Sequence, residues 1–303
     1  MNAREEWLNA RRAGLGGSDM GAILGLSKYR TPVDVYLENT GRIPGQDETL
    51  QMRFGSYAEE FVAQEYSRLT GHQVQRYTTM LHHPNAPILG NVDRLVIPEG
   101  QKRAAHQREI RTNRGMEAKT ASAFAAFDGN EWGLEGTDQI PAAYLVQCAT
   151  YMALTGCQFW DLAVLFGNQE VRVYNLVRDQ ALEDEIIARA DEWWTKHVLA
   201  DVAPEPSNID DCKKLFKTAE DKAIDADDTL MAWAKVAEDA AKKATEYHNT
   251  ADAAKVHLLA VMGNAAILRL DGNRVFKRSV VNKKEYTVAA SSFVTTRFTT
   301  TKE

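Results

Sequence analysis

The sequence predicts an α/β fold: a mixed β-sheet flanked by helices, followed by a C-terminal appendage with helical and β-hairpin parts. Three observations lead to this fold class. Short segments such as 88–97 alternate in polarity and are rich in branched side chains, as strands are. Segments with helical periodicity and capping signals lie between them. After Pro206 the chain lacks proline and becomes rich in Ala, Lys and acidic residues, which favours helix.

Helices are expected where apolar residues recur at helical spacing, with a capping residue before the segment or a glycine after it. Ser18 follows the glycine turn 14–17 and is the expected N-cap of one helix, whereas Pro141 opens and Gly156 closes another. The expected helices cover 4–12, 18–25, 31–39, 53–66, 141–154 and 180–198. The expected strands cover 73–81, 88–97, a segment around Glu117, and a hairpin of 159–166 and 171–177.

The 303 residues are expected to form two units, a main domain over 1–205 and an appendage over 206–303. Residues 218–262 predict one long helix or a helical hairpin, and 266–270 with 274–281 predict a β-hairpin. The appendage could clamp DNA, mediate oligomerisation or dock a partner protein, and the sequence does not choose among these roles.

Composition excludes several classes of protein. No apolar run approaches the length of a membrane span and the N-terminus lacks a signal-peptide core, so we expect a cytoplasmic protein without membrane contact. Cys148, Cys157 and Cys212 are odd in number and lack metal-type spacing. Structural zinc, an iron–sulfur cluster and a disulfide framework are therefore not expected.

Two carboxylates and a lysine form the most informative pattern. Asp93 lies in an apolar segment, and Glu117-Ala118-Lys119 follows after a connection. Residues i and i+2 of a strand project from one face, so Glu117 and Lys119 can share a cleft while Ala118 offers its backbone carbonyl. Carboxylates that bind a divalent metal, beside a lysine facing the attacking water, indicate a phosphodiesterase acting on DNA.

Each part of this pattern also has an ordinary explanation. Glu220-Asp-Lys222 repeats the Glu-x-Lys spacing in helix-like surroundings, so chance matches occur. Asp93 could instead be a turn or bulge residue paired with Arg94. Two facts favour the functional interpretation. Asp is generally depleted in strands, and here Asp93 is followed along the chain by the Glu117-Ala118-Lys119 element.

Further candidates lie on two helices. Glu60, five residues after Gly55, could supply another carboxylate to the metals, or lie on a solvated helix face. Gln147 and Tyr151 are four residues apart and share a helix face, where the amide could fix a phosphate or the lysine. A core tyrosine beside a surface glutamine is the alternative for that pair.

The net charge of −6 is unevenly distributed. The connection between the two acidic elements is strongly basic, and phosphate contacts could lie there, although a solvated surface is equally compatible with it. The basic residues in question are Lys102, Arg103, Arg108, Arg111 and Arg114. An acidic total charge therefore does not exclude DNA binding.

Taken together, these motifs resemble the PD-(D/E)XK nuclease superfamily, and most closely its YqaJ-type branch, which includes the phage lambda exonuclease. The resemblance covers about residues 4–200. The motifs that carry it are Gly55-x4-Glu60, Gly90-Asn-Val-Asp93-Arg94, Glu117-Ala-Lys119-Thr120, Gln147-x3-Tyr151 and the opening segment Trp7-x3-Arg11-x3-Leu15-Gly-Gly-Ser18-Asp19-x5-Gly25. The connection from Asp93 to Glu117 is longer and more basic than is typical of the family.

The resemblance implies a restriction-endonuclease-like core and hydrolysis of double-stranded DNA from its 5′ end. Such hydrolysis leaves a 3′ single strand for homologous recombination by single-strand annealing. Asp93, Glu117, the Ala118 carbonyl and Glu60 would hold Mg²⁺, or Mn²⁺, as two ions. Arg11 and Ser18 would bind the 5′-phosphate, and Arg94 would join the DNA contacts. A bacterial or phage origin, an annealing-protein partner and a ring-shaped homo-oligomer are further implications.

Two other functions remain open on the same core. One is a structure- or sequence-specific DNA endonuclease, which would have no use for the end-phosphate pocket that Arg11 and Ser18 imply. The other is a catalytically silent DNA-binding module, which would be expected to have lost at least one acidic ligand.

Overall fold

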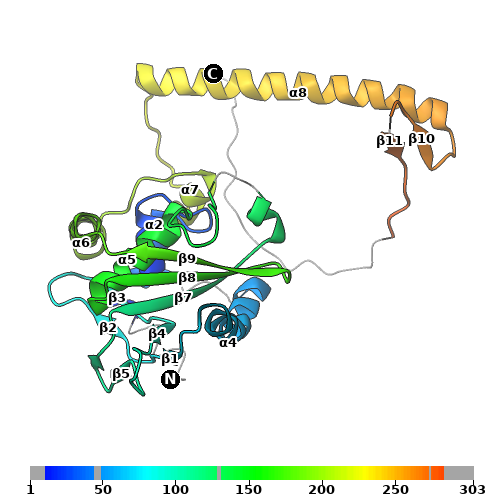
Figure 1. The fold of residues 1–303 in the computed structure, drawn as a ribbon. Helices are drawn as coiled ribbons and strands as arrows, with labels where there is room; N and C mark the ends of the chain where they lie inside the picture. Colours follow the sequence, from blue (N-terminus) through cyan, green and yellow to red (C-terminus); the bar gives the residue numbers. More distant parts are fainter. Residues whose placement is uncertain (1–10, 44–48, 128–130, 273, 283–303) are drawn as a thin grey trace. The chain divides into compact units, whose positions relative to one another are not determined.

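A computed structural model describes residues 11–43, 49–127, 131–272 and 274–282 of the chain. The chain divides into two compact units, Met1–Leu215 and Phe216–Glu303, and each is described by itself (Figure 1). None of the described helices is long and apolar enough to cross a lipid bilayer.

The first unit is built around a five-stranded mixed sheet. Its order is β1 (Val74–Arg76), β4 (Arg94–Val96), β7 (Arg114–Ala121), β8 (Phe159–Phe166) and β9 (Glu170–Val177). Strands β7 and β8 are parallel and the other neighbours are antiparallel. The crossover from β7 to β8 contains a helix, as a parallel pair requires. The predicted fold class is confirmed.

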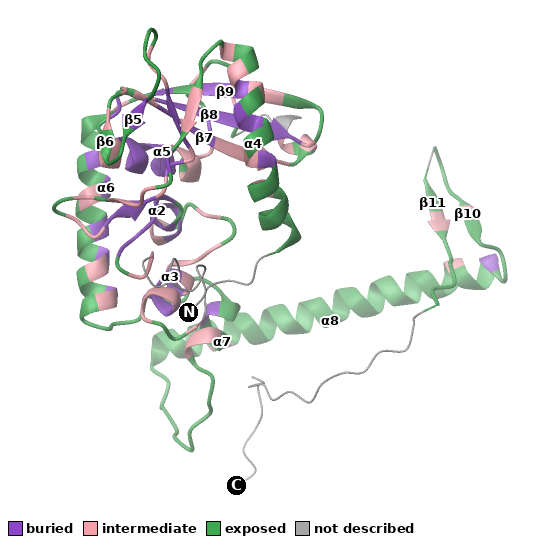
Figure 2. Ribbon diagram, turned by 90° about the horizontal axis from the view of Figure 1, so that it is seen from below, coloured by how far each residue is buried: buried purple, intermediate pink, exposed green. Residues whose placement is uncertain are grey.

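Helices cover both faces of this sheet (Figures 1 and 2). Strand β8 shows why: Trp160 and Leu162 belong to the core on the side of α5 (Ala142–Thr155), whereas Ala163 packs on the other side against α4 (Leu50–Thr70). Helices α2 (Gly17–Ile23) and α6 (Gln180–Trp193) pack with α5. The sheet is thus buried on both faces between two helical layers.

The remaining elements of the first unit are short. They are α3 (Pro32–Asn39), α7 (Ile209–Leu215), the 3₁₀ helix η1 (Ala123–Phe127), the π-helix η2 (Trp194–Leu199), and two hairpins, β2 (Leu81–His82) with β3 (Leu89–Gly90) and β5 (Ala105–His106) with β6 (Glu109–Ile110). Helix α7 is tied to α3 because Thr31 Oγ1 donates to Asp211 (2.8 Å) and Lys214 Nζ contacts Asp34 (2.5 Å). The unit therefore ends ten residues beyond the expected boundary at 205.

Three local expectations differ from the structure. The segment 88–97 is two strands, β3 and β4, and Asp93 lies at the bend between them. The segment 73–81 is likewise divided, into β1 and the start of β2. The N-cap of α2 is Gly16, whose N–H donates to the Asp19 carboxylate (2.8 Å), so Ser18 lies inside the first turn. The expected helix over 4–12 falls largely outside the described residues.

The second unit contains one long helix, α8 (Asp228–Met262), followed by the hairpin of β10 (Ile267–Arg269) and β11 (Val275–Lys277). Of the two possibilities for residues 218–262, the structure has the single helix, and it begins ten residues later than expected, at Asp228. Met262 is buried, whereas almost all other residues of α8 are exposed (Figure 2).

Candidate active site

The candidate site forms where β4 and β7 separate. The two strands pair only at Arg94 with Met116 and at Leu95 with Gly115. Asp93 precedes β4, and its Oδ2 accepts a hydrogen bond from the N–H of Ala118 (2.9 Å). The N–H and C=O of one strand residue point to the same side, so the Ala118 carbonyl also points toward the side of Asp93. One carboxylate and one carbonyl therefore converge at this sheet edge.

Glu117 and Lys119 share the opposite face of β7 from Ala118, as their spacing predicts. The Glu117 side chain is buried, and its Oε1 accepts from Lys119 Nζ (2.7 Å) and from the amide of Gln147 (2.7 Å). Its second oxygen, Oε2, is buried and has no hydrogen-bond partner. A buried acceptor without a partner is costly, so a cation or donor group that reached Oε2 would be stabilised there.

The charges at this site perturb one another. Burial, with Asp93 nearby, raises the pKa of Glu117 to about 8. Burial alone would lower the pKa of Lys119, but Glu117 and Asp93 outweigh it, so the pKa is raised and the side chain is an ammonium group. At neutral pH the Glu117 carboxyl is therefore mostly protonated, and a bound cation would favour its ionised form.

Gln147 and Tyr151 act on Glu117 from α5. The Gln147 amide donates to Glu117 and also to the Tyr151 hydroxyl (3.0 Å), so it fixes the orientation of the carboxylate. Both side chains are buried, which excludes the alternative of a surface glutamine. A Cβ at Gly17 would lie 2.9 Å from the Tyr151 ring, so only glycine lets the first turn of α2 approach this pair.

A cavity of about 220 Å³ opens over these groups. Residues Asp93 and 117–120 line it together with Gly55, Ser56, Glu59 and Val62 of α4. Glu59 lines the cavity and Glu60 does not, and the exposed fractions of their side chains are 20% and 63%. Helix phase explains this, because four residues after Gly55 return to about the same face and five do not. The third carboxylate at the cavity is therefore that of Glu59, and not that of Glu60, which the sequence predicts there.

Arg94 has a different position from the one expected. Its guanidinium is buried and donates to Glu59, to Glu60 (2.7 Å) and to the backbone carbonyl of Asp93 (2.8 Å). These bonds hold Glu59 beside the cavity and leave the guanidinium away from the surface. Arg94 is therefore a positioning residue for the site, and the expectation that it contacts DNA is not supported.

The basic connection contains the β5–β6 hairpin, and β4 and β7 pair despite its length. Lys102, Arg103 and Arg108 are exposed, and Arg111 pairs with Glu109 (2.6 Å). Arg114 instead contacts the buried Asp161 (2.6 Å), so it belongs to the scaffold. Four of the five basic residues are therefore exposed, including Arg111.

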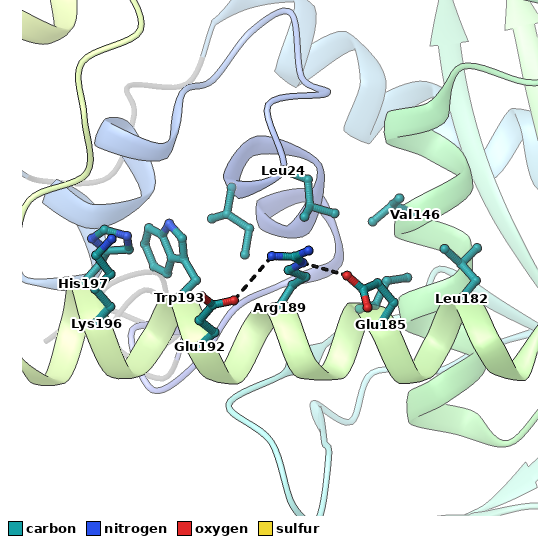
Figure 3. A pocket seen from close by; sticks show the side chains of 11 residues that line it. Leu24, Val146, Leu182, Glu185, Arg189, Glu192, Trp193, Lys196 and His197 are labelled. Atoms are coloured by element: carbon teal, nitrogen blue, oxygen red, sulfur yellow. Dashed lines mark hydrogen bonds and ion pairs between the residues drawn. The ribbon is translucent and has the colours of Figure 1, made fainter.

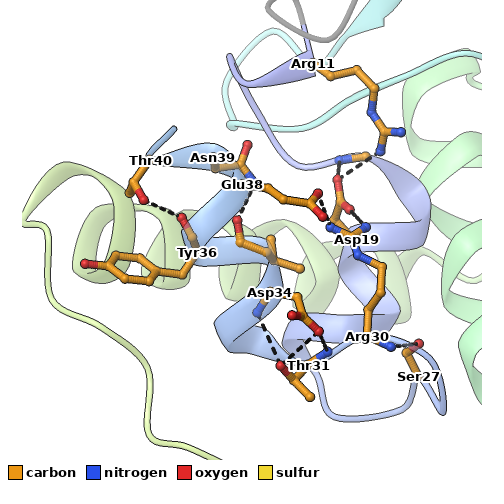
Figure 4. Close-up of polar contacts among 12 residues, drawn as sticks. Arg11, Asp19, Ser27, Arg30, Thr31, Asp34, Tyr36, Glu38, Asn39 and Thr40 are labelled. Carbon is orange, nitrogen blue, oxygen red and sulfur yellow. Dashed lines mark hydrogen bonds and ion pairs between the residues drawn. The ribbon is translucent and has the colours of Figure 1, made fainter. Parts of the chain in front are cut away.

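Arg11 and Ser18 lie at the beginning of α2. Arg11 contacts Asp19 (3.2 Å), and Arg30 joins Asp19 to Glu38 (2.7 Å from the guanidinium), as Figure 4 shows. Burial alone would raise the pKa of Asp19, but Arg30 and Arg11 outweigh it and lower that pKa. Sequence reasoning missed this network, although Asp19 falls within the opening motif. Ser18 is exposed in the same turn whose Gly17 touches Tyr151.

A larger cavity, of about 560 Å³, lies elsewhere, between α6, η2 and the ends of α2 and α5 (Figure 3). Its lining is apolar at Leu24, Val146 and Leu182, and at its rim Arg189 contacts Glu185 (2.7 Å) and Glu192 (3.4 Å). None of the candidate site residues lines it. Asp93, Glu117 and Lys119 line the smaller cavity instead.

Known proteins resemble this chain in sequence and in fold. Residues 6–158 match the model of the YqaJ-like viral recombinase domain. The chain is also 34% identical over 232 residues to the uncharacterized protein YqaJ of Bacillus subtilis (strain 168), an alignment covering 74% of this chain and 67% of that protein. The chain belongs to the YqaJ-like viral recombinase family. The resemblance stated from the motifs is thereby confirmed, and it makes the chain a member of a nuclease family.

One solved structure agrees on the fold of this YqaJ-like protein. LHK-Exo in complex with dAMP has a TM-score of 0.50 at 20% identity, covering 65% of this chain and 93% of that chain. A structure described as an alkaline exonuclease (LHK-Exo) from Laribacter hongkongensis has a TM-score of 0.49 at 19% identity with the same coverage. The first of these therefore shares the fold of the first unit of this chain, which we call the nuclease unit.

Proposed function

We propose that the protein is a divalent-metal-dependent exonuclease that hydrolyses one strand of double-stranded DNA from its 5′ end. The remaining 3′ single strand would serve recombination by single-strand annealing. One observation carries the proposal: Glu117, whose Oε2 is buried without a hydrogen-bond partner, lines a cavity that Asp93, Lys119 and Glu59 also line. A phosphodiesterase needs this combination of acceptors and one ammonium group.

The donor groups fit Mg²⁺. Asp93 and Glu117 supply carboxylates, the Ala118 carbonyl points to the same edge, and Glu59 is a third carboxylate at the cavity. Within the described ranges, no three His, Cys, Asp or Glu side chains are already arranged as a metal site. Mg²⁺ suits such a place, because it is usually held by one or two carboxylates together with waters and substrate phosphates. Two ions, with Mn²⁺ as a possible replacement, are part of the proposal.

Bound metal would supply a water of lowered pKa and neutralise charge on the phosphate. The protein residues have separate tasks. The Lys119 ammonium group, held at 2.7 Å from Glu117, would orient the attacking water, and Gln147 with Tyr151 would keep the Glu117 carboxylate in place. Arg94 would do the same for Glu59.

The substrate end would bind at α2. Arg11 and Ser18 lie in or beside the turn that contacts Tyr151, so a 5′-phosphate there would be close to the scissile bond. Lys102, Arg103, Arg108 and Arg111 would contact the duplex backbone. An annealing-protein partner and a ring-shaped assembly follow from the family resemblance alone.

The first experiment compares linear duplexes bearing 5′-phosphate or 5′-hydroxyl ends with closed circular DNA, in magnesium or in chelator. We expect magnesium-dependent loss of linear DNA only, faster with 5′-phosphate, and no cleavage by Lys119→Ala. Lys213→Ala, also a lysine but exposed on α7 and outside the cavity, is the matched control and should remain active. Cleavage of closed circles would identify an endonuclease, and absence of any Lys119-dependent cleavage would identify a silent binding module.

A further inference from the structure

Helix α8 exposes an apolar seam along its whole length. In one heptad register, every a and d position from 230 to 261 is apolar. These positions are Leu230, Trp233, Ala237, Ala240, Ala244, Tyr247, Ala251, Ala254, Leu258 and Val261. Each of the other six registers puts a charged side chain into the seam, so this repeat is specific.

The described structure leaves this seam uncovered. Nine of the ten residues are exposed and Leu258 is half-buried. The exposed fractions of Trp233 and Tyr247 are 67% and 75%. Helical stability in proteins comes mainly from packing of an apolar face, and a sustained a/d repeat is the pattern of helices that pair. We propose that α8 pairs with α8 of a second copy of this chain in an antiparallel coiled coil.

Side-chain size favours the second copy, in that orientation. Antiparallel pairing about the centre of the seam opposes each a residue to a d residue of the partner. The resulting layers are Leu230 with Val261, Trp233 with Leu258, Ala237 with Ala254, Ala240 with Ala251, and Ala244 with Tyr247. Large residues meet large ones at both ends, alanines meet alanines between, and the tyrosine meets the small Ala244. A parallel pair would instead stack Trp233 and Tyr247 on themselves between alanine layers, which demands uneven helix separation.

Charge agrees with the same orientation. The positions flanking the seam carry Lys243, Lys255, His248 and His257 and no acid, so a pairing must keep these basic groups apart. In the antiparallel pair, Lys243 faces the partner's Thr250 and Lys255 faces the partner's Ala234. In the parallel pair, Lys243 would face the partner's His248 on both sides. Antiparallel macrodipoles also attract.

The pairing selects oligomerisation from the three roles that the sequence leaves open for the appendage. Helix α8 is 35 residues long, so its two ends are about 50 Å apart. Because the nuclease unit precedes α8 in the chain, an antiparallel pair attaches the two nuclease units at opposite ends of the coiled coil. This proposal does not depend on the catalytic activity proposed above.

Disulfide trapping tests both the pairing and its direction. In a Cys212→Ser background, where the remaining cysteines are buried, we compare Ala237→Cys/Ala254→Cys with Ala237→Cys alone under mild oxidation. The double variant should form a covalent dimer on a non-reducing gel. The single variant should not, because residues 237 of the two copies would be about 25 Å apart along the axis. Glu238→Cys/Ala253→Cys, at the same level but facing outward, is the matched control.

Three results would overturn the proposal: no dimer from the double variant, equal trapping of the outward control, or trapping of the single variant as efficient as that of the double. The last would indicate a parallel pair. Trapping reports on α8 whatever assembly the nuclease units adopt.

Sedimentation equilibrium supplies a second, non-covalent measurement on the full chain. Ala240→Glu/Ala251→Glu puts charges into the seam, and Ala232→Glu/Ala253→Glu puts the same charges on the outer face with the same helix propensity. We expect the seam variant to raise the dissociation constant by about 100-fold or more, with unchanged helix content by circular dichroism. An equal effect of the outer-face variant, or no effect of the seam variant, would contradict the pairing.

Discussion

Two acids buried on adjacent strands of the same sheet have opposite surroundings. Asp161 on β8 faces α4, and its oxygens accept from Tyr66 (2.5 Å), Arg114 (2.6 Å) and Asn175 (2.8 Å). Glu117 on β7 faces α5, and one of its oxygens has no partner. Both carboxylates are almost inaccessible to solvent. Burial therefore does not distinguish scaffold from site here, whereas incomplete hydrogen bonding does.

The two acids should affect the stability of the protein in opposite ways. A fully bonded acid stabilises the arrangement of the elements that supply its donors, and here Tyr66 and Arg114 join α4 and β7 to β8. An incompletely bonded acid destabilises the protein until a ligand arrives, so it is retained for chemistry. Substitution of each acid should accordingly affect different properties.

The largest expected effect is on catalysis. Glu117→Gln removes a charge from the proposed metal site and should lower the cleavage rate by at least about 10³-fold. The midpoint of thermal unfolding without metal should change little, because burial and Asp93 raise the pKa of Glu117 to about 8 and the carboxyl is then mostly neutral at pH 7. Single-turnover cleavage and scanning calorimetry measure the two effects. A variant with more than a tenth of the wild-type rate would remove Glu117 from the site.

The converse substitution should affect stability. Asp161→Ala leaves Arg114 and Tyr66 without their acceptor and should lower the free energy of unfolding by about 3 kcal/mol. Urea denaturation measures this change. The cleavage rate per folded molecule should stay within about threefold of wild type, and Asp161→Asn, which keeps part of the bonding, should be milder. A rate loss as large as that of Glu117→Gln would contradict the distinction between the two acids.

A smaller effect on activity is expected for Glu59, the third carboxylate at the cavity. Glu59→Gln should lower activity about 10-fold to 100-fold, and Glu60→Gln, one residue further along the same helix, should lower it less than about threefold. Both substitutions remove one acceptor charge from Arg94, so they are closely matched. Steady-state rates at saturating magnesium measure the difference. The reverse ranking would restore Glu60 to the site.

The smallest effect is thermodynamic and needs no substrate. Mg²⁺ at about ten times its dissociation constant should stabilise the wild type by about 1.4 kcal/mol, since it binds the folded state. Asp161→Asn should keep this stabilisation and Glu117→Gln should lose it. Thermal unfolding with and without Mg²⁺ measures it, with Ca²⁺ as a comparison ion. Equal stabilisation of both variants would mean that the ion binds elsewhere.

Much of the fold could be predicted from the sequence because local signals agree with the packing. The helix from Pro141 to Gly156 and the hairpin across Gly167 follow their capping and turn residues closely. The split of 88–97 could not be predicted, because alternation continues through Asp93 although the chain leaves one hairpin and enters the sheet there. Helix α7 was missed because the contacts that hold it in the first unit, with α3 and through Leu215 with the core, are tertiary and leave no local signal.

The candidate site shows the same limit. Spacing alone predicts that Glu117 and Lys119 share a face and that Gln147 and Tyr151 lie together, and the structure brings all four into contact or near contact. The choice between Glu59 and Glu60 depends on the rotation of α4 about its axis, which tertiary packing sets. Arg94 looks like a surface cation in sequence, and only its burial between α4 and β4 identifies its partners.

The open edge of β7 has a consequence for solubility. An unpaired strand edge is a template on which another chain can add a strand. Within the described chain, β4 pairs with β7 only as far as Met116, and no other strand of the sheet pairs with β7 on that side. The next N–H at this edge, that of Ala118, donates to the Asp93 carboxylate. Asp93 thus places a negative charge where intermolecular pairing would begin. Its replacement by alanine should promote aggregation in addition to abolishing activity, whereas Glu117→Gln should leave the protein soluble.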